Sequence, residues 1–187
     1  MSKPYFAKKQ KKILAEAAII AEELIVNYFC LSAAQWKRMP YEVKTITELH
    51  TKEVPPVSAF AQLLLYTVAL ENKKRGADCP QLYKICLNDP KILSASQAGT
   101  QSLLMPLLIY IMTHELVHIV RFSKFYHLPQ SLKNREEEER RVEEITEQIL
   151  VPVKVSGMRE TIQNFSQISS EIDNRLSPLP FYSVCRI

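Results

Sequence analysis

One long apolar segment, residues 103–120, constrains the fold of this chain more than any other feature. Its length and composition predict a helix that is buried nearly all round. Three polar side chains, His114, Glu115 and His118, interrupt it. Because buried polar and charged groups are costly without partners, the segment predicts a site where these three side chains are satisfied together.

The spacing of the two histidines predicts a metal site. His114 and His118 are four residues apart, which places both imidazoles on one face of a helix, about 40° apart, where they can bind one Zn²⁺. Glu115 lies at the edge of that face, where a carboxylate can take a proton from metal-activated water. A core helix whose polar groups only bond to neighbours is the weaker interpretation, because a metal would satisfy all three at once.

Composition limits the possible partners. The chain has 187 residues, 47% of them hydrophobic, which suits one domain with an appended helical part. The formal net charge of +4 is mild and the basic residues are dispersed, so no nucleic-acid partner is expected. The basic cluster at residues 8–12 is interpreted as the solvated start of a helix.

Cysteine usage and the N-terminus favour a cytoplasmic protein. The four cysteines, Cys30, Cys79, Cys86 and Cys185, form no CxxC pair, which suits reduced thiols rather than a structural zinc site. The chain begins without an apolar signal segment. The apolar run at residues 103–120 carries three ionisable groups, so it is expected to be a buried core helix without membrane contact.

The remaining apolar patterns predict a mainly helical α+β fold. Apolar side chains at three- and four-residue steps predict helices at residues 9–31, 136–151 and 158–172, the last followed by a proline-containing tail. The register is lost after Pro40, so we expect an N-terminal helical region at residues 1–56 and a main domain at 57–187, or one continuous domain. The N-terminal helix is a possible oligomerisation element or a cover for the site.

Two segments carry strand signals. Residues 60–70 are long enough for a helix, although their centre also fits a buried strand. Residues 82–87 alternate in polarity and predict a strand before the stop signal at 88–90. As an exposed sheet edge this strand would hold a peptide by main-chain hydrogen bonds, and as a plain structural strand it would not.

A catalytic zinc needs a third protein ligand, and the sequence offers four candidates. Arg121 and Lys124 stand where a metzincin needs glycine and histidine, which excludes that class. The acidic helix that follows is the better source. Glu139 and Glu143 are one turn apart, so one can ligate the metal while the other orients a histidine. The other two candidates are Glu138, which periodicity places near the apolar stripe of that helix, and His127.

The motif at residues 114–118, His-Glu-Leu-Val-His, followed by the glutamate-led segment 139–152, resembles the ImmA/IrrE-type zinc peptidases. Members of that family are similar to gluzincins, and the likeness covers about residues 107–152. It implies a zincin-like domain with a small sheet packed on the HExxH helix. Val117 departs from the family's glycine, and Val142, Ile145 and Thr146 depart from its usual Ala, Phe and Ala.

The same resemblance implies one Zn²⁺ per chain, held by His114, His118 and Glu139, with Glu143 where the family has Asn or Asp. The implied function is a zinc metallopeptidase in which Glu115 is the general base and a protein or peptide is the substrate. For the oxyanion, Tyr126 or His127 is better placed than Tyr110, which is expected in the core. The alternative is a non-catalytic zinc-binding interaction or regulatory protein on the same scaffold.

Overall fold

The computed structural model describes residues 5–67, 81–97, 103–125, 132–173 and 182–186. They form a mixed α+β fold that is mainly helical, as the sequence predicted. The helices are α1 (Lys8–Tyr28), α2 (Ala33–Trp36), α3 (Asp89–Ser96), α4 (Leu104–Phe125), α5 (Leu132–Leu150) and α6 (Met158–Asp173). The strands are β1 (Tyr41–Lys44), β2 (Ala61–Thr67), β3 (Gln81–Leu87) and β4 (Tyr182–Arg186).

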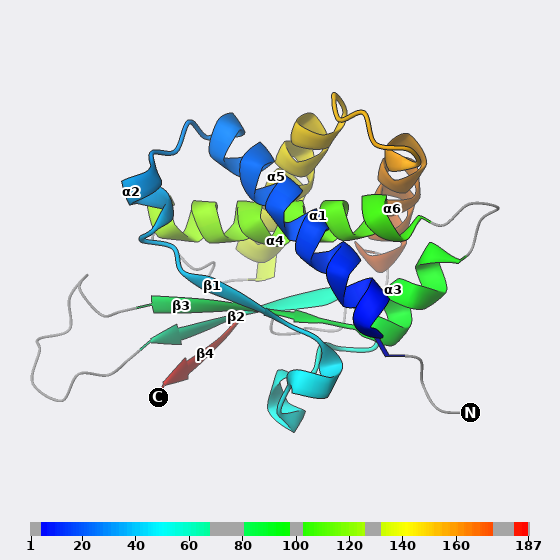
Figure 1. Cartoon of the computed structure of the whole chain (residues 1–187). Coiled ribbons are helices and arrows are strands. Elements are labelled where there is room, and N and C mark those ends of the chain that lie inside the picture. Colours follow the sequence, from blue (N-terminus) through cyan, green and yellow to red (C-terminus); the bar gives the residue numbers. More distant parts are fainter. Residues whose placement is uncertain (1–4, 68–80, 98–102, 126–131, 174–181, 187) are drawn as a thin grey trace, which may run out of the picture.

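Helix α4 is the centre of the fold. Figure 1 shows it between the sheet and the other long helices, and it contacts α1, α3, α5, α6 and β2. By length and composition it is the one helix in the described residues that could cross a membrane, but 83% of its apolar window is buried. Packing of this helix inside the protein therefore accounts for its apolar character.

Helix α1 covers α4 through a stripe of small and branched side chains. Leu14, Ala17, Ala21 and Ile25 recur at three- and four-residue steps, and each is at most 8% exposed. The two alanines allow α1 and α4 to approach closely, because they add little side-chain volume between the helix axes. The helix predicted at residues 9–31 is thus present and forms part of the same core as α4.

The sheet has the strand order β1-β3-β2-β4 and lies beneath the helices (Figure 1). Strand β3 runs parallel to β1 and antiparallel to β2, with Val43 and Leu63 both opposite Ile85. Tyr83, Ile85 and Leu87 alternate with Lys84 and Cys86, and the first three belong to the core cluster that α4 forms. The predicted strand at residues 82–87 is therefore correct.

Its interpretation as an exposed edge is wrong, because β3 is paired on both sides. Among the described residues, β1 and β4 are the edge strands. Strand β4 was not predicted from the sequence. It pairs in parallel with β2 and follows residues 174–181, which lie outside the described part of the chain.

For residues 61–67 the helix interpretation is also wrong, and the strand alternative holds for β2, while residues 68–70 lie outside the described part of the chain. Leu63 and Leu64 are adjacent in sequence, yet they are only 2% and 1% exposed. In a strand, neighbouring side chains point to opposite faces, so both faces of β2 are covered here. A strand buried on both faces reads as a continuous apolar run, which periodicity cannot distinguish from a buried helix.

Two other helix starts were placed incorrectly or missed. The signal at residues 88–90 ends β3, but it also begins α3, because the Asn88 side chain accepts a hydrogen bond from the Lys91 N–H at 3.4 Å. Helix α5 begins at Leu132, four residues before the predicted start at Glu136.

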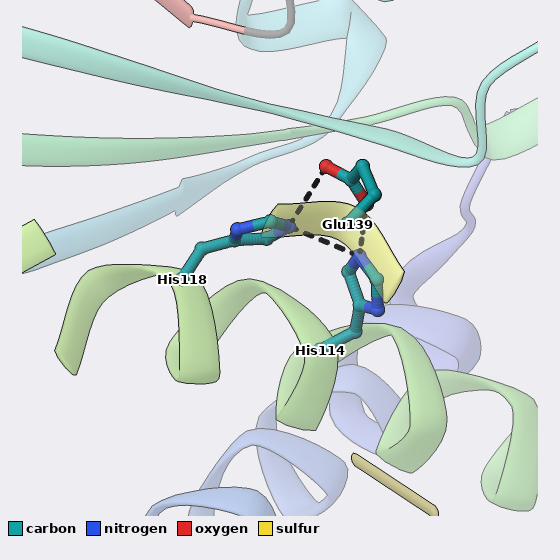
Figure 2. Close-up of side chains that lie close together, drawn as sticks. All are labelled: His114, His118 and Glu139. Atoms are coloured by element: carbon teal, nitrogen blue, oxygen red, sulfur yellow. Dashed lines mark hydrogen bonds and ion pairs between the residues drawn. The ribbon is translucent and has the colours of Figure 1, made fainter. Parts of the chain in front are cut away.

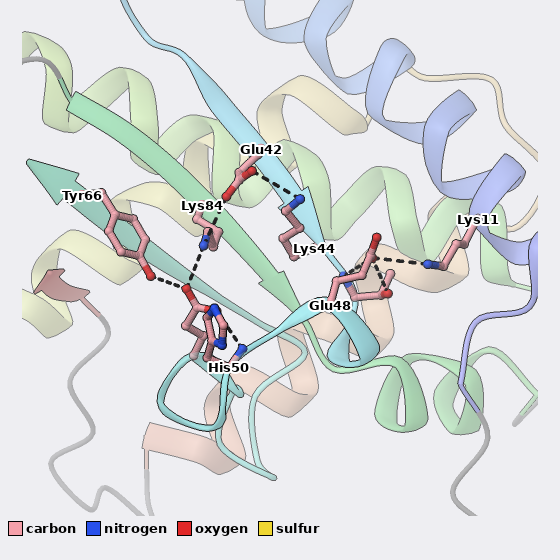
Figure 3. A network of polar contacts seen from close by, with 9 residues as sticks. Lys11, Glu42, Lys44, Glu48, His50, Tyr66 and Lys84 are labelled. Atoms are coloured by element: carbon pink, nitrogen blue, oxygen red, sulfur yellow. Dashed lines mark hydrogen bonds and ion pairs between the residues drawn. The ribbon is translucent and has the colours of Figure 1, made fainter. Parts of the chain in front are cut away.

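A polar network covers the face of the sheet away from α4 (Figure 3). Glu53, in the single-turn helix Thr51–Glu53, has a side chain only 8% exposed and lies 2.7 Å from Lys84 Nζ. It also accepts hydrogen bonds from the Tyr66 hydroxyl and, at 2.9 Å, from the His50 N–H. Burial alone raises the pKa of Glu53, but these donors outweigh it and lower the pKa to about 2.

This network makes a prediction about acid stability. Because the folded pKa of Glu53 is depressed, its stabilisation is complete above about pH 4.5 and is lost as the pH falls toward 2. Replacing Glu53 by Gln is expected to lower the free energy of unfolding by about 3 kcal/mol at pH 7, with the gap to wild type narrowing toward pH 3. Urea denaturation at both pH values measures this. The exposed Glu16→Gln is the control, and a gap that does not change with pH would contradict the assignment.

The turn before α6 makes a second prediction. Gly157 has a φ of 81°, and a Cβ at this position would lie 2.6 Å from Leu103 Cδ2 of the buried core. Gly157→Ala is therefore expected to lower the free energy of unfolding by about 1 to 2 kcal/mol. Thermal denaturation measures the loss, with the adjacent exposed Ser156→Ala as control. Equal melting temperatures for the two variants would show that neither strain nor crowding acts here.

Candidate metal centre

Helix α4 presents two imidazoles from successive turns. The Nε2 atoms of His114 and His118 lie 3.1 Å apart, and the ring centroids lie 4.8 Å apart (Figure 2). The side chain of His118 is 3% exposed and that of His114 is 18% exposed. The i, i+4 spacing predicted this juxtaposition, and the packing of α4 in the core limits how far either ring can turn away.

Helix α5 brings a carboxylate to the same point. Glu139 Oε1 lies 3.2 Å from His118 Nε2, and Oε2 lies 3.4 Å from His114 Nε2. Figure 2 shows all three side chains directed toward one another from two different helices. One ligand atom from each residue can be chosen so that all lie within 4.8 Å of one another.

The spacing of these atoms fits a metal ion. Ligands at about 2.0 to 2.1 Å from a tetrahedral zinc lie about 3.3 Å from each other, close to the observed 3.1 to 3.4 Å. Two imidazole nitrogens and a carboxylate oxygen are a donor set that Zn²⁺ accepts. A hydrogen on one ring nitrogen can bond to only one of the other two groups. A cation at the centre can bind both Nε2 atoms and the Glu139 carboxylate at once. The residues present therefore fit a metal.

Electrostatics also favour a cation here. Burial raises the pKa of Glu139, but the two histidines outweigh burial and hold it well below its usual range. Burial lowers the pKa of His114, but the hydrogen bond and charge of Glu139, with the charges of Glu115 and Glu143, raise it overall. The three carboxylates thus create a negative field at the imidazoles, and this field attracts positive charge.

Glu115 lies beside the cluster in an apolar setting. The residue is 8% exposed, and burial raises the pKa of its carboxyl, while the charges of His114 and His118 oppose that rise. Its neighbours Leu116 and Val117 are fully buried. A carboxyl whose pKa is raised toward neutrality is suited to accept and return a proton.

Glu138, the rival ligand, is paired elsewhere. Its carboxylate contacts Arg121 of α4, with Oε1 at 2.5 Å from Nε and Oε2 at 2.7 Å from Nη2. Periodicity correctly placed Glu138 on the inner side of α5, above the buried Val142. It did not reveal Arg121, which is the functional neighbour that sequence reasoning missed.

The other two candidate ligands are Glu143 and His127. Glu143 is close enough for its charge to raise the pKa of His114 and of Tyr110, but it is not a member of the metal-binding group. His114 Nδ1 is buried and forms no hydrogen bond with the described part of the chain, so Glu143 does not orient this ring directly. His127 and Tyr126 lie outside the described residues.

Aromatic rings flank the histidines along α4. Tyr110 stacks over His114 at a centroid distance of 6.5 Å, and Phe122 stacks over His118 at 5.7 Å. Phe165 of α6 stacks on Tyr110 at 4.2 Å. Tyr110 is 2% exposed, as expected for a core residue. The i±4 spacing from the histidines could have identified Phe122, but the sequence carries no signal for Phe165.

Comparison with known proteins does not assign the chain to a family. No protein-family model matches it, and neither the curated proteins nor the solved structures give a match. The functional argument therefore depends on the residues of the site.

The geometry makes a prediction about metal binding. Removing a ligand by His118→Ala or Glu139→Gln is expected to weaken zinc binding by at least about 100-fold, because two ligand atoms hold the ion less well than three. Competition with a chromophoric chelator measures the affinity. The exposed Glu144→Gln on α5 is the matched control and should bind as wild type does. Wild-type affinity in the two ligand variants would contradict the assignment.

Proposed function

We propose that this protein is a zinc-dependent metallopeptidase of the gluzincin-like, HExxH class. The observation that carries the proposal is the convergence of His114, His118 and Glu139 at 3.1 to 3.4 Å, with the buried Glu115 next to the first ligand. The resemblance of residues 107–152 to the ImmA/IrrE-type peptidases points to the same ligands and the same base.

The number of ligands favours a catalytic over a structural zinc. Structural zinc sites are closed by four protein ligands, whereas catalytic sites keep three and leave one position open. Among the described residues, the cluster contains three donor side chains, and its carboxylate and outer histidine are 23% and 18% exposed. Two of the three donor side chains are therefore in contact with solvent.

The residues divide the work of hydrolysis between them. His114, His118 and Glu139 would hold the ion. When bound, the ion would act as a Lewis acid that lowers the pKa of water toward about 7 and polarises a carbonyl. Glu115 takes the proton from the attacking water as its oxygen bonds to the scissile carbon. Glu115 then delivers this proton to the amide nitrogen, the C–N bond breaks, and a carboxylic acid and an amine leave.

The raised pKa of Glu115 supports this role. A carboxylate with a low pKa donates a proton readily once it is protonated, but it is a weak base and accepts a proton from water poorly. Burial among apolar side chains moves the carboxyl pKa upward, toward the working range of a proton shuttle. The substrate is expected to be a peptide or protein, because the HExxH motif and the downstream glutamate resemble those of peptidases.

A single substitution tests the proposal. Glu115→Gln keeps the shape of the side chain but cannot accept the proton, so peptide hydrolysis is expected to fall at least about 100-fold while one zinc per chain is retained. Cleavage of a peptide library, followed by mass spectrometry, measures activity, and elemental analysis measures zinc. Glu144→Gln is the control variant.

Two outcomes would count against the proposal. Hydrolysis that survives in Glu115→Gln would remove the assigned base. Zinc-loaded wild-type protein that cleaves no member of the library would favour the non-catalytic zinc-binding alternative.

A further inference from the structure

A second contact joins the two helices that build the metal centre. Arg121 of α4 and Glu138 of α5 meet through two parallel contacts of 2.5 and 2.7 Å, and each side chain is only 15% exposed. A planar guanidinium that grips both oxygens of a carboxylate fixes orientation as well as distance. A largely buried pair of this kind is screened less by water than a surface pair.

Each member of the pair lies within one helical turn of a ligand. Arg121 follows His118 by three residues, so both lie on neighbouring parts of the same face of α4. Glu138 directly precedes Glu139 on α5, and successive side chains on a helix point about 100° apart. Glu138 can contact the arginine while Glu139 contacts the histidines only if α5 has a narrow range of rotation and translation relative to α4.

An ion pair within α5 shows the contrast. Arg140 and Glu144 are also 2.5 Å apart, but both belong to α5 and their side chains are 63% and 54% exposed. That pair spans one turn of a single helix and cannot orient α5 relative to α4.

We propose that Arg121 and Glu138 form a positioning pair that sets the rotation of α5, so that Glu139 and not Glu138 becomes the third metal ligand. The pair has two effects. It holds α5 against α4 at the level of the site, and it occupies both oxygens of Glu138, which otherwise competes with Glu139 for the ion. The inference rests on the metal centre of the proposed function, but not on hydrolysis.

The experiment measures metal affinity and ligand geometry in the full chain. Glu138→Gln removes the charge, Arg121→Lys keeps a charge but loses the two-point grip, and Glu144→Gln is the matched control from the exposed pair. Zinc affinity is measured by chelator competition, and visible absorption of the Co²⁺-substituted protein reports the ligand set. Circular dichroism and the melting temperature identify variants that fail to fold.

The expected result is a loss of zinc affinity of about 10- to 100-fold in Glu138→Gln and Arg121→Lys, with an altered Co²⁺ spectrum. The control retains wild-type affinity and spectrum. A purely structural pair would lower the melting temperature but leave the Co²⁺ spectrum unchanged. Folded Glu138→Gln and Arg121→Lys proteins that both bind zinc within about twofold of wild type would overturn the inference.

The same data separate this inference from the proposed function. The wild-type protein could bind zinc and cleave no peptide while both variants lose zinc affinity as expected. That result would contradict the peptidase proposal and support the positioning pair. If the wild-type protein cleaves peptides and both variants bind zinc as tightly as wild type, the peptidase proposal is supported and the positioning pair is contradicted.

Discussion

The burial of α4 is the constraint on which the rest of the structure depends. An almost wholly apolar helix is stable only when it is covered on most sides, and α1, α5, α6 and the sheet provide that cover. The polar residues of its centre then lie in apolar surroundings, where each needs a partner. Glu139 meets this need by approaching His114 and His118 from α5, so the fold and the site have the same physical origin.

The charges on α5 divide between two tasks because α4 offers two kinds of partner. Arg121 is a cation and takes Glu138 in a two-point contact, while the imidazoles of His114 and His118 lie against Glu139 in a group that could hold a metal ion. The charge of Glu143 raises the pKa of His114. An acidic run that would be assigned to solvent by its charge thus contains two inward-facing carboxylates with different partners.

Part of this arrangement could be predicted from the sequence. Helical periodicity predicted α1, α4 and α6, and the histidine spacing predicted the paired imidazoles, because both depend on local geometry. Strands β1 and β4 were missed, since pairing between distant segments leaves little local pattern. Helix α3 was missed because residues 88–90 both end β3 and cap the next helix, and only the first role was assigned to them. Glu138 and Glu139 could not be separated by residue spacing alone, because the choice depends on how α5 is rotated against α4, and Arg121 decides that in three dimensions. Val117 fills a fully buried position that the resembled family gives to glycine.

The most direct test of the central claim is X-ray absorption at the zinc edge of protein purified without chelator. The account predicts one zinc per chain, with two imidazole nitrogens and carboxylate oxygen at about 2.0 to 2.2 Å and no sulfur ligand. Absence of stoichiometric zinc, or a sulfur shell at about 2.3 Å, would contradict a centre built from His114, His118 and Glu139.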